Sequence, residues 1–342
     1  MSDTLQGSEL CRSPVLDPRR LSSERRDNGT PRRRPGLSVV VITANEERNL
    51  QRCLRSASWA DEIVVVDNFS TDRTLEIARE FTPNVVQRPW PGYSAQKAFA
   101  VSLSDCEWVL SLDADEEVTP ELAQAISKIV KSESEPANPH GQTMHGLSQA
   151  QSELESGSSG AAPDGYFIRR QTFFMGRPLY HAARPDWQLR LFRAERAEML
   201  HRRVHEAFST THPAHLLGGV LNHYTAETIQ ERFNTVNRFS GLEAEERRRV
   251  PRAWAKLRAW TYALAWPPRS FIGNYFLRLG MLDGLPGFVW CAATAIEHFL
   301  VGVKQLERIG AEGSAAGRAA NCRRPAGRPL HVPETGGEPL CG

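Results

Sequence analysis

The first third of the chain alternates apolar and polar segments in a way that predicts a parallel α/β sheet. Residues 39–42 are β-branched and continuous, as expected for a strand covered on both faces. The order of strand, polar turn and helix then recurs, with further strands expected at 63–66, in NVVQRPW and in EWVLSLDAD. Such alternation implies parallel strands joined by right-handed crossovers. The predicted fold class is therefore α/β, a Rossmann-like, mostly parallel sheet flanked by helices.

Local patterns refine this outline. After the first strand, Thr43 or Asn45 is expected to cap a helix whose first turn contains Glu46 and Glu47. The segment GYSAQKAFAVSLS predicts another helix. The segments GYFIRRQTFFMGRPL and WQLRLFR alternate in polarity and predict antiparallel strands.

Composition divides the chain into regions. Residues 1–36 are rich in Arg, Ser and Pro and predict a disordered basic tail, which is solvated or, alternatively, attracted to anionic lipid. The Ser- and Gly-rich residues 132–163 predict a flexible insertion within one domain, 37–250. Residues 251–310 predict a C-terminal helical region, and 311–342 predict a second disordered tail.

Charge and cysteine content narrow the class of protein. The net charge of +2 does not favour a nucleic-acid partner, and 40% hydrophobic residues are typical of a globular protein. The six cysteines form no CxxC pair, so neither a zinc site nor a disulfide framework is expected, and a reducing cytoplasm fits best. The N-terminus has no signal-like apolar core, and the longest apolar run is interrupted by Glu297 and His298.

The segment WVLSLDADEEVTPEL places four carboxylates within five positions, directly after an apolar strand. Residues two apart on an extended segment point the same way, so Asp113 and Asp115 can face one ion together. A hard divalent cation offsets their repulsion and also bridges phosphate oxygens. We therefore expect Mg²⁺ or Mn²⁺ to bind here with a nucleotide diphosphate. The alternative is that Asp115, Glu116 and Glu117 only charge the N-terminus of the following helix.

Two other predicted strands also end in polar clusters, and ligands of open α/β sheets bind beyond the carboxyl ends of strands. One cluster runs from Thr43 to Glu46 and the other begins at Asp67. Asp67 can accept hydrogen bonds from a base or ribose, or it can form an Asx turn. The absence of GxGxxG and GxxxxGK[ST] from the sequence disfavours a dinucleotide enzyme and a P-loop NTPase.

A family resemblance rests on these segments together. The stretch SVVVITANEERNLQRCLRSASWADEIVVVDNFSTDRT, followed by WVLSLDADE, resembles the nucleotide-sugar half of inverting family 2 glycosyltransferases with the GT-A fold. The segments RPDWQLRLFR, RVHEAF, LNHYT and FLRLGMLDGLPGF further resemble lipopolysaccharide core β-1,4-glucosyltransferases. The resemblance covers residues 37–308 except the insertion. It implies a UDP-sugar donor, expected to be UDP-glucose, and a lipid-linked, heptose-containing lipopolysaccharide core as acceptor.

The resemblance also implies roles for individual residues. The uridine pocket is expected to contain Thr43, Asn45, Glu46 and Asp67. Gln96 and Lys97 are expected beside the nucleotide-sugar. Asp113 is expected to contact ribose or metal, Asp115 to bind the metal, and His223 either to complete the metal shell or to be structural. Glu206 in RVHEAF is the expected general base, since a sugar hydroxyl needs a positioned carboxylate to take its proton, and His205 is expected to orient it.

Two further groups of residues leave alternatives open. Asp186, Arg190 and Arg193 either hold acceptor or phosphate, or form an internal salt bridge. The helical region contains tryptophans interleaved with basic residues. The tryptophans are Trp254, Trp260, Trp266 and Trp290, and the basic residues are Lys256, Arg258, Arg269 and Arg278. This pattern suits a surface in the lipid headgroup layer, although the tryptophans can equally pack the helices onto the catalytic domain. We expect a cytoplasmic protein in peripheral contact with the inner membrane.

Two rival functions remain at this point. In a phosphohydrolase, Asp113 would be the nucleophile and Asp115 the acid/base, but that class expects its acidic motif on the first strand. A non-catalytic protein of the same fold would bind the nucleotide-sugar without turnover.

Overall fold

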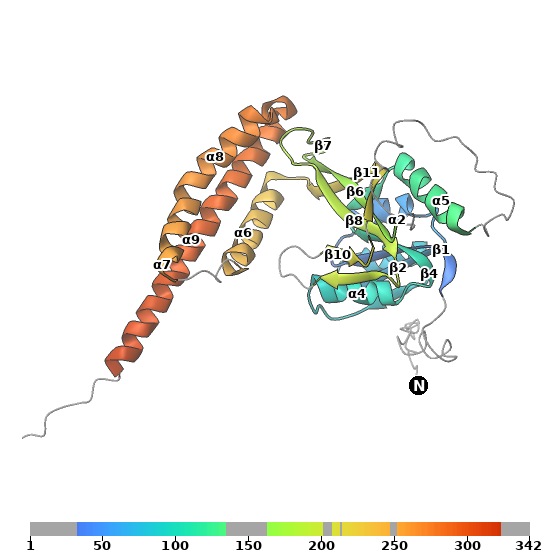
Figure 1. The fold of residues 1–342 in the computed structure, drawn as a ribbon, viewed down its shortest axis with the longest axis horizontal. Helices are drawn as coiled ribbons and strands as arrows, with labels where there is room; N and C mark the ends of the chain where they lie inside the picture. The colour runs from blue at the N-terminus through green and yellow to red at the C-terminus, as the bar shows by residue number, and fades with distance from the viewer. Residues whose placement is uncertain (1–32, 135–162, 201–206, 213, 247–251, 323–342) are drawn as a thin grey trace, which may run out of the picture.

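Among the described residues, a nine-stranded sheet forms the larger part of the protein, and a bundle of long helices extends to one side (Figure 1). The computed structural model describes residues 33–134, 163–200, 207–212, 214–246 and 252–322. The strands are β1 (Arg34–Thr43), β2 (Glu62–Asp67), β3 (Val85–Gln87), β4 (Cys106–Asp113), β5 (Glu116–Val118), β6 (Gly165–Phe174), β7 (Arg177–Pro178), β8 (Asp186–Arg193), β9 (Ala197–Leu200), β10 (Ala207–Thr210) and β11 (Ala214–Ala226).

The helices complete the list. Those around the sheet are α2 (Leu50–Ser56), α3 (Thr74–Phe81), α4 (Tyr93–Ser102) and α5 (Pro120–Ser134). Those of the bundle are α6 (Ile229–Glu246), α7 (Arg252–Trp260), α8 (Trp266–Ile272) and α9 (Gly284–Cys322). The π-helical turn η2 (Thr261–Ala265) joins α7 to α8, and the π-helical turn η3 (Gly273–Leu277) extends α8, so that these elements form one rod. The 3₁₀ turn η4 (Gly280–Asp283) precedes α9.

The predicted parallel half of the sheet is confirmed. Its four strands run parallel in the order β3-β2-β1-β4. Thr43 pairs with Asp67, Asp67 pairs with Gln87, and Ile42 pairs with Asp113. The polar ends of these strands therefore lie side by side at one edge of the sheet, as the sequence predicts.

The other half of the sheet is mixed. β8 runs antiparallel to both β4 and β6. This confirms the antiparallel strands predicted from GYFIRRQTFFMGRPL and WQLRLFR, which contain most of β6 and β8. β11 runs parallel to β6 and antiparallel to the short strand β5. The whole is a mostly parallel sheet flanked by helices with a C-terminal helical region, so the predicted fold class is confirmed.

Burial on both faces of the sheet explains the continuous apolar run of the first strand. Val39 and Val41 pack in one cluster with side chains of α2, α3 and α5, whereas Val40 and Ile42 pack with α4 and β8 on the opposite face. Cys53, Cys106 and Cys291 are buried and free.

The predicted helix start after β1 is wrong. α2 begins at Leu50 with Asn49 at its N-cap, so neither Thr43 nor Asn45 caps it. Asn45 instead adopts a left-handed conformation with φ of 55°, and its side-chain oxygen accepts a hydrogen bond from the Thr71 backbone N–H at 2.8 Å. Asn45 does not cap the helix because its side chain links the loop after β1 to the loop after β2.

The predicted boundary of the helical region also needs correction. α6 lies within the predicted domain 37–250, yet it packs mainly against α9 (Figure 1). The Lys304 ammonium donates to the Asn237 carbonyl at 2.6 Å and to the Ser240 hydroxyl at 2.9 Å, which ties the two helices together. α9 continues to Cys322, beyond the predicted end at 310. Most of the predicted insertion and of both predicted tails lies outside the described residues.

Candidate functional site

A chain of alternating charges crosses the sheet where its parallel half meets its antiparallel half. Asp113, at the end of β4, accepts from the Lys97 ammonium through Oδ1 at 2.8 Å and from Arg190 Nη2 through Oδ2 at 2.7 Å. Burial by itself raises the pKa of Asp113, but Arg190 and Lys97 outweigh it and hold this pKa well below its usual range. Asp113 is therefore a charged carboxylate with both oxygens paired to cations.

The chain of charges continues toward β6. Arg190 Nη2 lies 2.6 Å from Glu116 Oε1, and Arg170 Nη1 lies 3.3 Å from the same oxygen. Arg170 Nε also donates to Asp186 Oδ2 at 2.9 Å. The side chains of Arg190 and Glu116 are almost fully buried, so each charge is stabilised by the other rather than by water. The Glu116 carboxylate further accepts the Asp113 backbone N–H at 2.9 Å, which fixes the acidic turn.

A second group lies on the other side of the acidic turn. Asp115 Oδ2 is 3.2 Å from His223 Nε2, and the Asp115 carbonyl accepts the Tyr224 backbone N–H at 2.9 Å. The Tyr224 hydroxyl donates to Glu117 Oε2 at 2.6 Å, and the Arg52 guanidinium lies over the Tyr224 ring at 3.5 Å. Burial and Glu117 raise the pKa of Tyr224 to about 12, so this hydroxyl keeps its proton. The resemblance implies this proximity in one of the two alternatives for His223, and the pairing of β5 with β11 brings the two residues together.

Several carboxylates lie near one another at the acidic edge. Burial raises the pKa of Glu46, the hydrogen bond from the Asn49 amide lowers it by less, and the charges of Asp115, Asp72 and Asp113 each add a smaller raising effect. Glu46 lies on the loop after β1, which confirms that three predicted polar clusters converge. A bound cation would relieve this mutual repulsion.

Two predicted pocket residues retain unused hydrogen-bonding groups. In the described part of the chain, Thr43 Oγ1 and both polar atoms of the Gln96 amide are buried without a partner. Each such group costs about 1–3 kcal/mol in a folded protein. Unpaired polar atoms beside a strand edge are expected where a ligand, rather than the protein, supplies the partner.

Asp67 has a structural role in its loop, although its carboxylate bonds the backbone three residues on rather than two, as an Asx turn would require. Its fully buried carboxylate accepts the Ser70 backbone N–H at 3.0 Å and the Gln87 amide at 2.9 Å through Oδ2, and it accepts the Ser70 hydroxyl through Oδ1. The next residue but one, Phe69, has a φ of 48° and is exposed. Asp67 therefore shapes the loop beside the site, and its contact with a base stays a prediction.

The structure separates the three residues of RPDWQLRLFR. Arg190 joins the charge chain directly, and Asp186 joins it through Arg170, which realises the internal salt bridge left open by the sequence. Arg193 lies at the opposite end of β8, where its guanidinium stacks on Trp108 and lies 4.0 Å from Glu107. Arg193 is therefore not brought to the site. Glu206 and His205 lie outside the described residues.

Sequence reasoning missed Arg170 and the role of Glu116. Glu116 appeared as a helix-charging residue, but it lies in strand β5 and is buried between two arginines. Arg190 occupies a polar position of the alternating segment WQLRLFR, and Arg170 lies in a segment with several polar residues, so the local pattern gave no signal that either arginine is paired with Glu116. An arginine is almost never buried unless it is paired, but its burial is known only from the structure.

A divalent cation fits one part of this arrangement. Asp115 and His223 offer an oxygen and a nitrogen ligand side by side, both partly exposed, next to an edge with unrelieved negative charge. Asp113 fits less well as a ligand, because each of its oxygens already faces a cation. Among the described residues, no cluster of three or more His, Cys, Asp or Glu side chains has the geometry of a preformed metal site. The protein would supply two ligands, and the bound nucleotide would supply others.

Comparisons with known proteins agree with this geometry. Residues 38–137 match the family model described as Glycosyl transferase family 2. An uncharacterised glycosyltransferase of Rickettsia typhi is 28% identical over 77% of this chain and 84% of its own length. A lipopolysaccharide core biosynthesis glycosyltransferase of Rhizobium meliloti, LpsC, is 25% identical over 80% of this chain and 92% of its own length. The crystal structure of S. aureus TarS in complex with UDP-GlcNAc is 12% identical over 82% of this chain and 92% of TarS, with a TM-score of 0.35, which is too low to transfer any property.

Proposed function

Because residues 38–137 form a glycosyltransferase family 2 domain, we propose that this chain transfers a hexose, expected to be glucose, from a UDP-sugar to a lipopolysaccharide core or related glycan. The observation that supports the proposal most directly is that two groups of residues meet at the end of β4. Asp113 with Lys97 and Arg190 forms the first group, and Asp115 with His223 forms the second.

The donor would lie along the carboxyl ends of β1, β2 and β4. The unpaired Thr43 hydroxyl and Gln96 amide would bind its uridine or ribose, and Lys97 would face the diphosphate. Arg190 holds the Asp113 carboxylate from the opposite side, so Asp113 keeps one orientation and a full charge when the donor binds. The donor class comes from the family and from the resemblance of the acidic motif.

Asp115 and His223 would hold Mg²⁺ or Mn²⁺. When bound, such a cation stabilises negative charge on the departing diphosphate. The residues of the chain orient the two ligands for it, since Tyr224 and Glu117 fix the backbone around Asp115. Metal dependence of the reaction is part of the proposal.

For the acceptor, the similarity to LpsC, whose name assigns it to lipopolysaccharide core biosynthesis, supports a core oligosaccharide carried on lipid. Glu206 would take the proton of the acceptor hydroxyl as that oxygen attacks the anomeric carbon from the face opposite UDP, which inverts its configuration. We place the reaction at the cytoplasmic face of the inner membrane, where a lipid-linked acceptor is presented.

The geometry disfavours the phosphohydrolase alternative. A nucleophilic carboxylate needs an accessible oxygen, whereas both oxygens of Asp113 are paired with Lys97 and Arg190. The acidic motif also follows β4 rather than the first strand of the sheet.

The test is a transfer assay. Purified protein is incubated with a panel of radiolabelled UDP- and GDP-sugars and a membrane glycolipid extract, with and without EDTA. Label should pass from one UDP-sugar to the lipid fraction, and EDTA should abolish the transfer. Hydrolysis of generic phosphate esters without sugar transfer would favour the phosphohydrolase, and UDP-sugar binding without any turnover would favour the non-catalytic alternative.

A further inference from the structure

We propose that the outer face of the helical rod from α7 to η3 docks onto the surface of an anionic lipid bilayer. The rod lies against α9, and α6 packs on α9 as well, so α9 lies between the rod and α6 (Figure 1). The inference concerns binding to lipid and does not require the proposed transfer activity.

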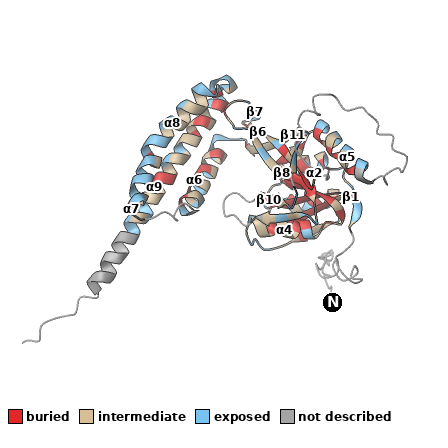
Figure 2. Ribbon diagram, in the orientation of Figure 1, coloured by how far each residue is buried: buried red, intermediate tan, exposed pale blue. Residues whose placement is uncertain are grey.

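The rod reverses the usual distribution of large and small side chains. Ala259 and Ala263 face α9 and are buried, and a Cβ on Gly302 of α9 would lie 2.4 Å from the Ala263 backbone nitrogen. The large apolar residues are exposed instead, and much of the rod is coloured as exposed in Figure 2. Those exposed on the rod and the following turn are Trp254, Leu257, Trp260, Leu264, Trp266, Ile272, Phe276, Leu277, Leu279, Met281 and Leu282.

This arrangement is unfavourable in water and normal against lipid. Leaving one large apolar side chain exposed forgoes roughly 1.5–3 kcal/mol of burial, and here many such side chains share one rod. Helices that face lipid instead place small residues at helix–helix contacts and direct large apolar residues outward. The rod therefore has the packing of a membrane-contacting helix.

Charge identifies the kind of membrane. Residues 251–282 contain no Asp or Glu, whereas Lys256, Arg258, Arg269 and Arg278 are all exposed on the rod. Basic side chains beside an apolar helix face attract anionic headgroups, at about 1 kcal/mol for each cation. The same charges disfavour a symmetric dimer through this face, because a two-fold contact would set the basic patch against itself.

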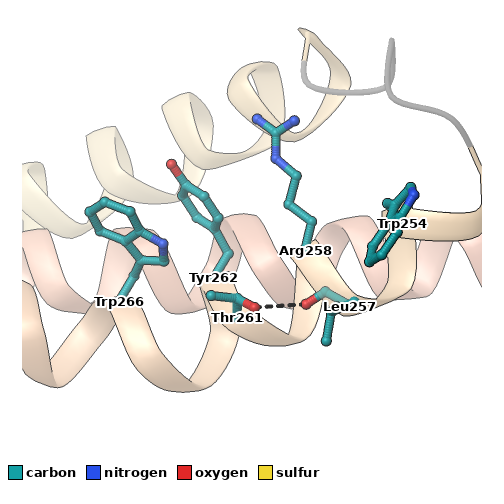
Figure 3. A pocket seen from close by; sticks show the side chains of 6 residues that line it. All are labelled: Trp254, Leu257, Arg258, Thr261, Tyr262 and Trp266. Carbon is teal, nitrogen blue, oxygen red and sulfur yellow. Dashed lines mark hydrogen bonds between the residues drawn. The ribbon is translucent and has the colours of Figure 1, made fainter.

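A depression on the rod shows where a headgroup would lie. A shallow hollow of about 440 Å³ is lined by Trp254, Leu257, Arg258, Thr261, Tyr262 and Trp266 (Figure 3). Tyr262 and Trp266 stack with centroids 5.4 Å apart, and the Arg258 guanidinium extends on the same side of the rod as these rings (Figure 3). Amphipathic rings around a cation suit the boundary between phosphate and acyl chain.

The surface would lie on the bilayer rather than cross it. Arg269 sits in the middle of the rod, and Glu297 in the middle of α9 lies 3.7 Å from Arg232 of α6. The face of α6 that points away from α9 presents mainly polar side chains, such as Gln230, Asn234 and Arg238. By length and composition alone, the helical segment Gly280–Ala311 could span a membrane, but its other neighbour is this water-exposed helix.

Flotation of the full chain with vesicles tests the proposal. Binding is measured on phosphatidylcholine vesicles with and without phosphatidylglycerol, at low and high salt. We expect binding that requires phosphatidylglycerol and weakens with salt. The double variant Leu257→Asp, Leu264→Asp should lose binding at least about tenfold, and Arg258→Gln should lose about fivefold. The matched control Ile229→Asp, Leu242→Asp places the same two charges at exposed positions of α6 and should bind like the wild type.

Three results would overturn the proposal. The first is vesicle binding by the double variant at the wild-type level, and the second is a loss of binding in the control that equals the loss in the double variant. The third is a dimer, detected by light scattering without lipid, that the double variant converts to a monomer, because a second copy of the chain would then occupy the face. Circular dichroism of each variant checks that the helices remain folded.

Discussion

The Nη2 atom of Arg190 lies 2.7 Å from Oδ2 of Asp113, and this contact joins β8 to the end of β4 where their hydrogen-bonded ladder has already ended. The ladder stops at the pair Leu110 and Leu191, so side chains continue the connection toward the site. The same nitrogen also contacts Glu116, so one buried arginine holds both ends of the acidic turn. The turn is thereby fixed by charge rather than by backbone pairing.

This arrangement makes Glu116 important for stability. In Glu116→Gln, Arg190 and Arg170 lose a fully buried counter-charge, and each keeps one carboxylate, Asp113 for Arg190 and Asp186 for Arg170. We expect the free energy of unfolding to fall by about 2 kcal/mol, less than for a buried charge left without any partner, measured by urea denaturation. The control is Glu117→Gln, whose partner is the neutral Tyr224 hydroxyl, with an expected loss of about 1 kcal/mol or less. Equal losses in the two variants would contradict this view of the charge chain.

The pairing of Asp113 predicts a pH dependence. Because its pKa is lowered in the folded protein, its stabilising contribution is present above the unfolded value of about 3.9 and is lost as the pH falls through the folded value. Asp113→Asn should therefore be less stable than the wild type by about 2–3 kcal/mol at neutral pH. The difference should stay constant from about pH 5 to 8 and shrink below about pH 4. Thermal melts of both proteins across this range measure it, and a difference that grows in acid would refute the assignment.

Much of the fold was predictable because it depends on local pattern. The parallel strands have continuous apolar runs and polar ends, and those ends determine which loops share an edge. The meeting of Asp115 with His223 was predictable only through the family resemblance, since it results from β5 pairing with β11 across more than a hundred residues. Neither the sequence pattern nor the resemblance indicated Arg170, because its partners come from strands that are distant in sequence.

The helical unit also shows that tertiary pairing could not be predicted from local sequence. Residues 251–310 were predicted to be helical, but no helix was predicted at α6, and its residues were included in the sheet domain because its partner, α9, follows it only after the whole rod. Specific contacts attach α6 to α9, since Arg232 lies over Trp290 and close to Glu297. Such tertiary pairings have no signature in local composition.

Removal of the metal ligands should separate binding of the cation from binding of the nucleotide. If Asp115 and His223 hold Mn²⁺, His223→Ala should raise the Mn²⁺ concentration needed for half-maximal transfer at least about tenfold. Asp115→Asn should weaken both Mn²⁺ and UDP binding, followed by calorimetry. As a control, His215→Ala changes a histidine earlier on β11 and should leave the metal dependence unchanged. An unchanged Mn²⁺ requirement in His223→Ala would assign this histidine a structural role.

The close contact of the rod with α9 predicts opposite effects for two glycines of the same helix. In Gly302→Ala the new Cβ would lie 2.4 Å from the Ala263 nitrogen and 2.7 Å from the Ala259 carbonyl oxygen, so the helices must separate, at a cost of about 1–3 kcal/mol. In Gly310→Ala the Cβ meets no atom within 4 Å, and the helix should gain roughly 0.5–1 kcal/mol. Urea denaturation of the two variants should therefore shift in opposite directions, and a stabilised Gly302→Ala would disprove the close contact.

The base assignment is the prediction that depends most on the family resemblance, because Glu206 lies outside the described residues. A carboxamide cannot accept the proton of the attacking hydroxyl, so Glu206→Gln should lower the rate of transfer by roughly 10²–10⁴-fold. It leaves the donor site untouched, so UDP affinity, measured by calorimetry, should stay close to that of the wild type. The control is Glu198→Gln, a neighbouring and exposed glutamate on β9, which should transfer sugar at the wild-type rate. A wild-type rate for Glu206→Gln would move the base to another carboxylate, and a loss of UDP affinity would place Glu206 in the donor site instead.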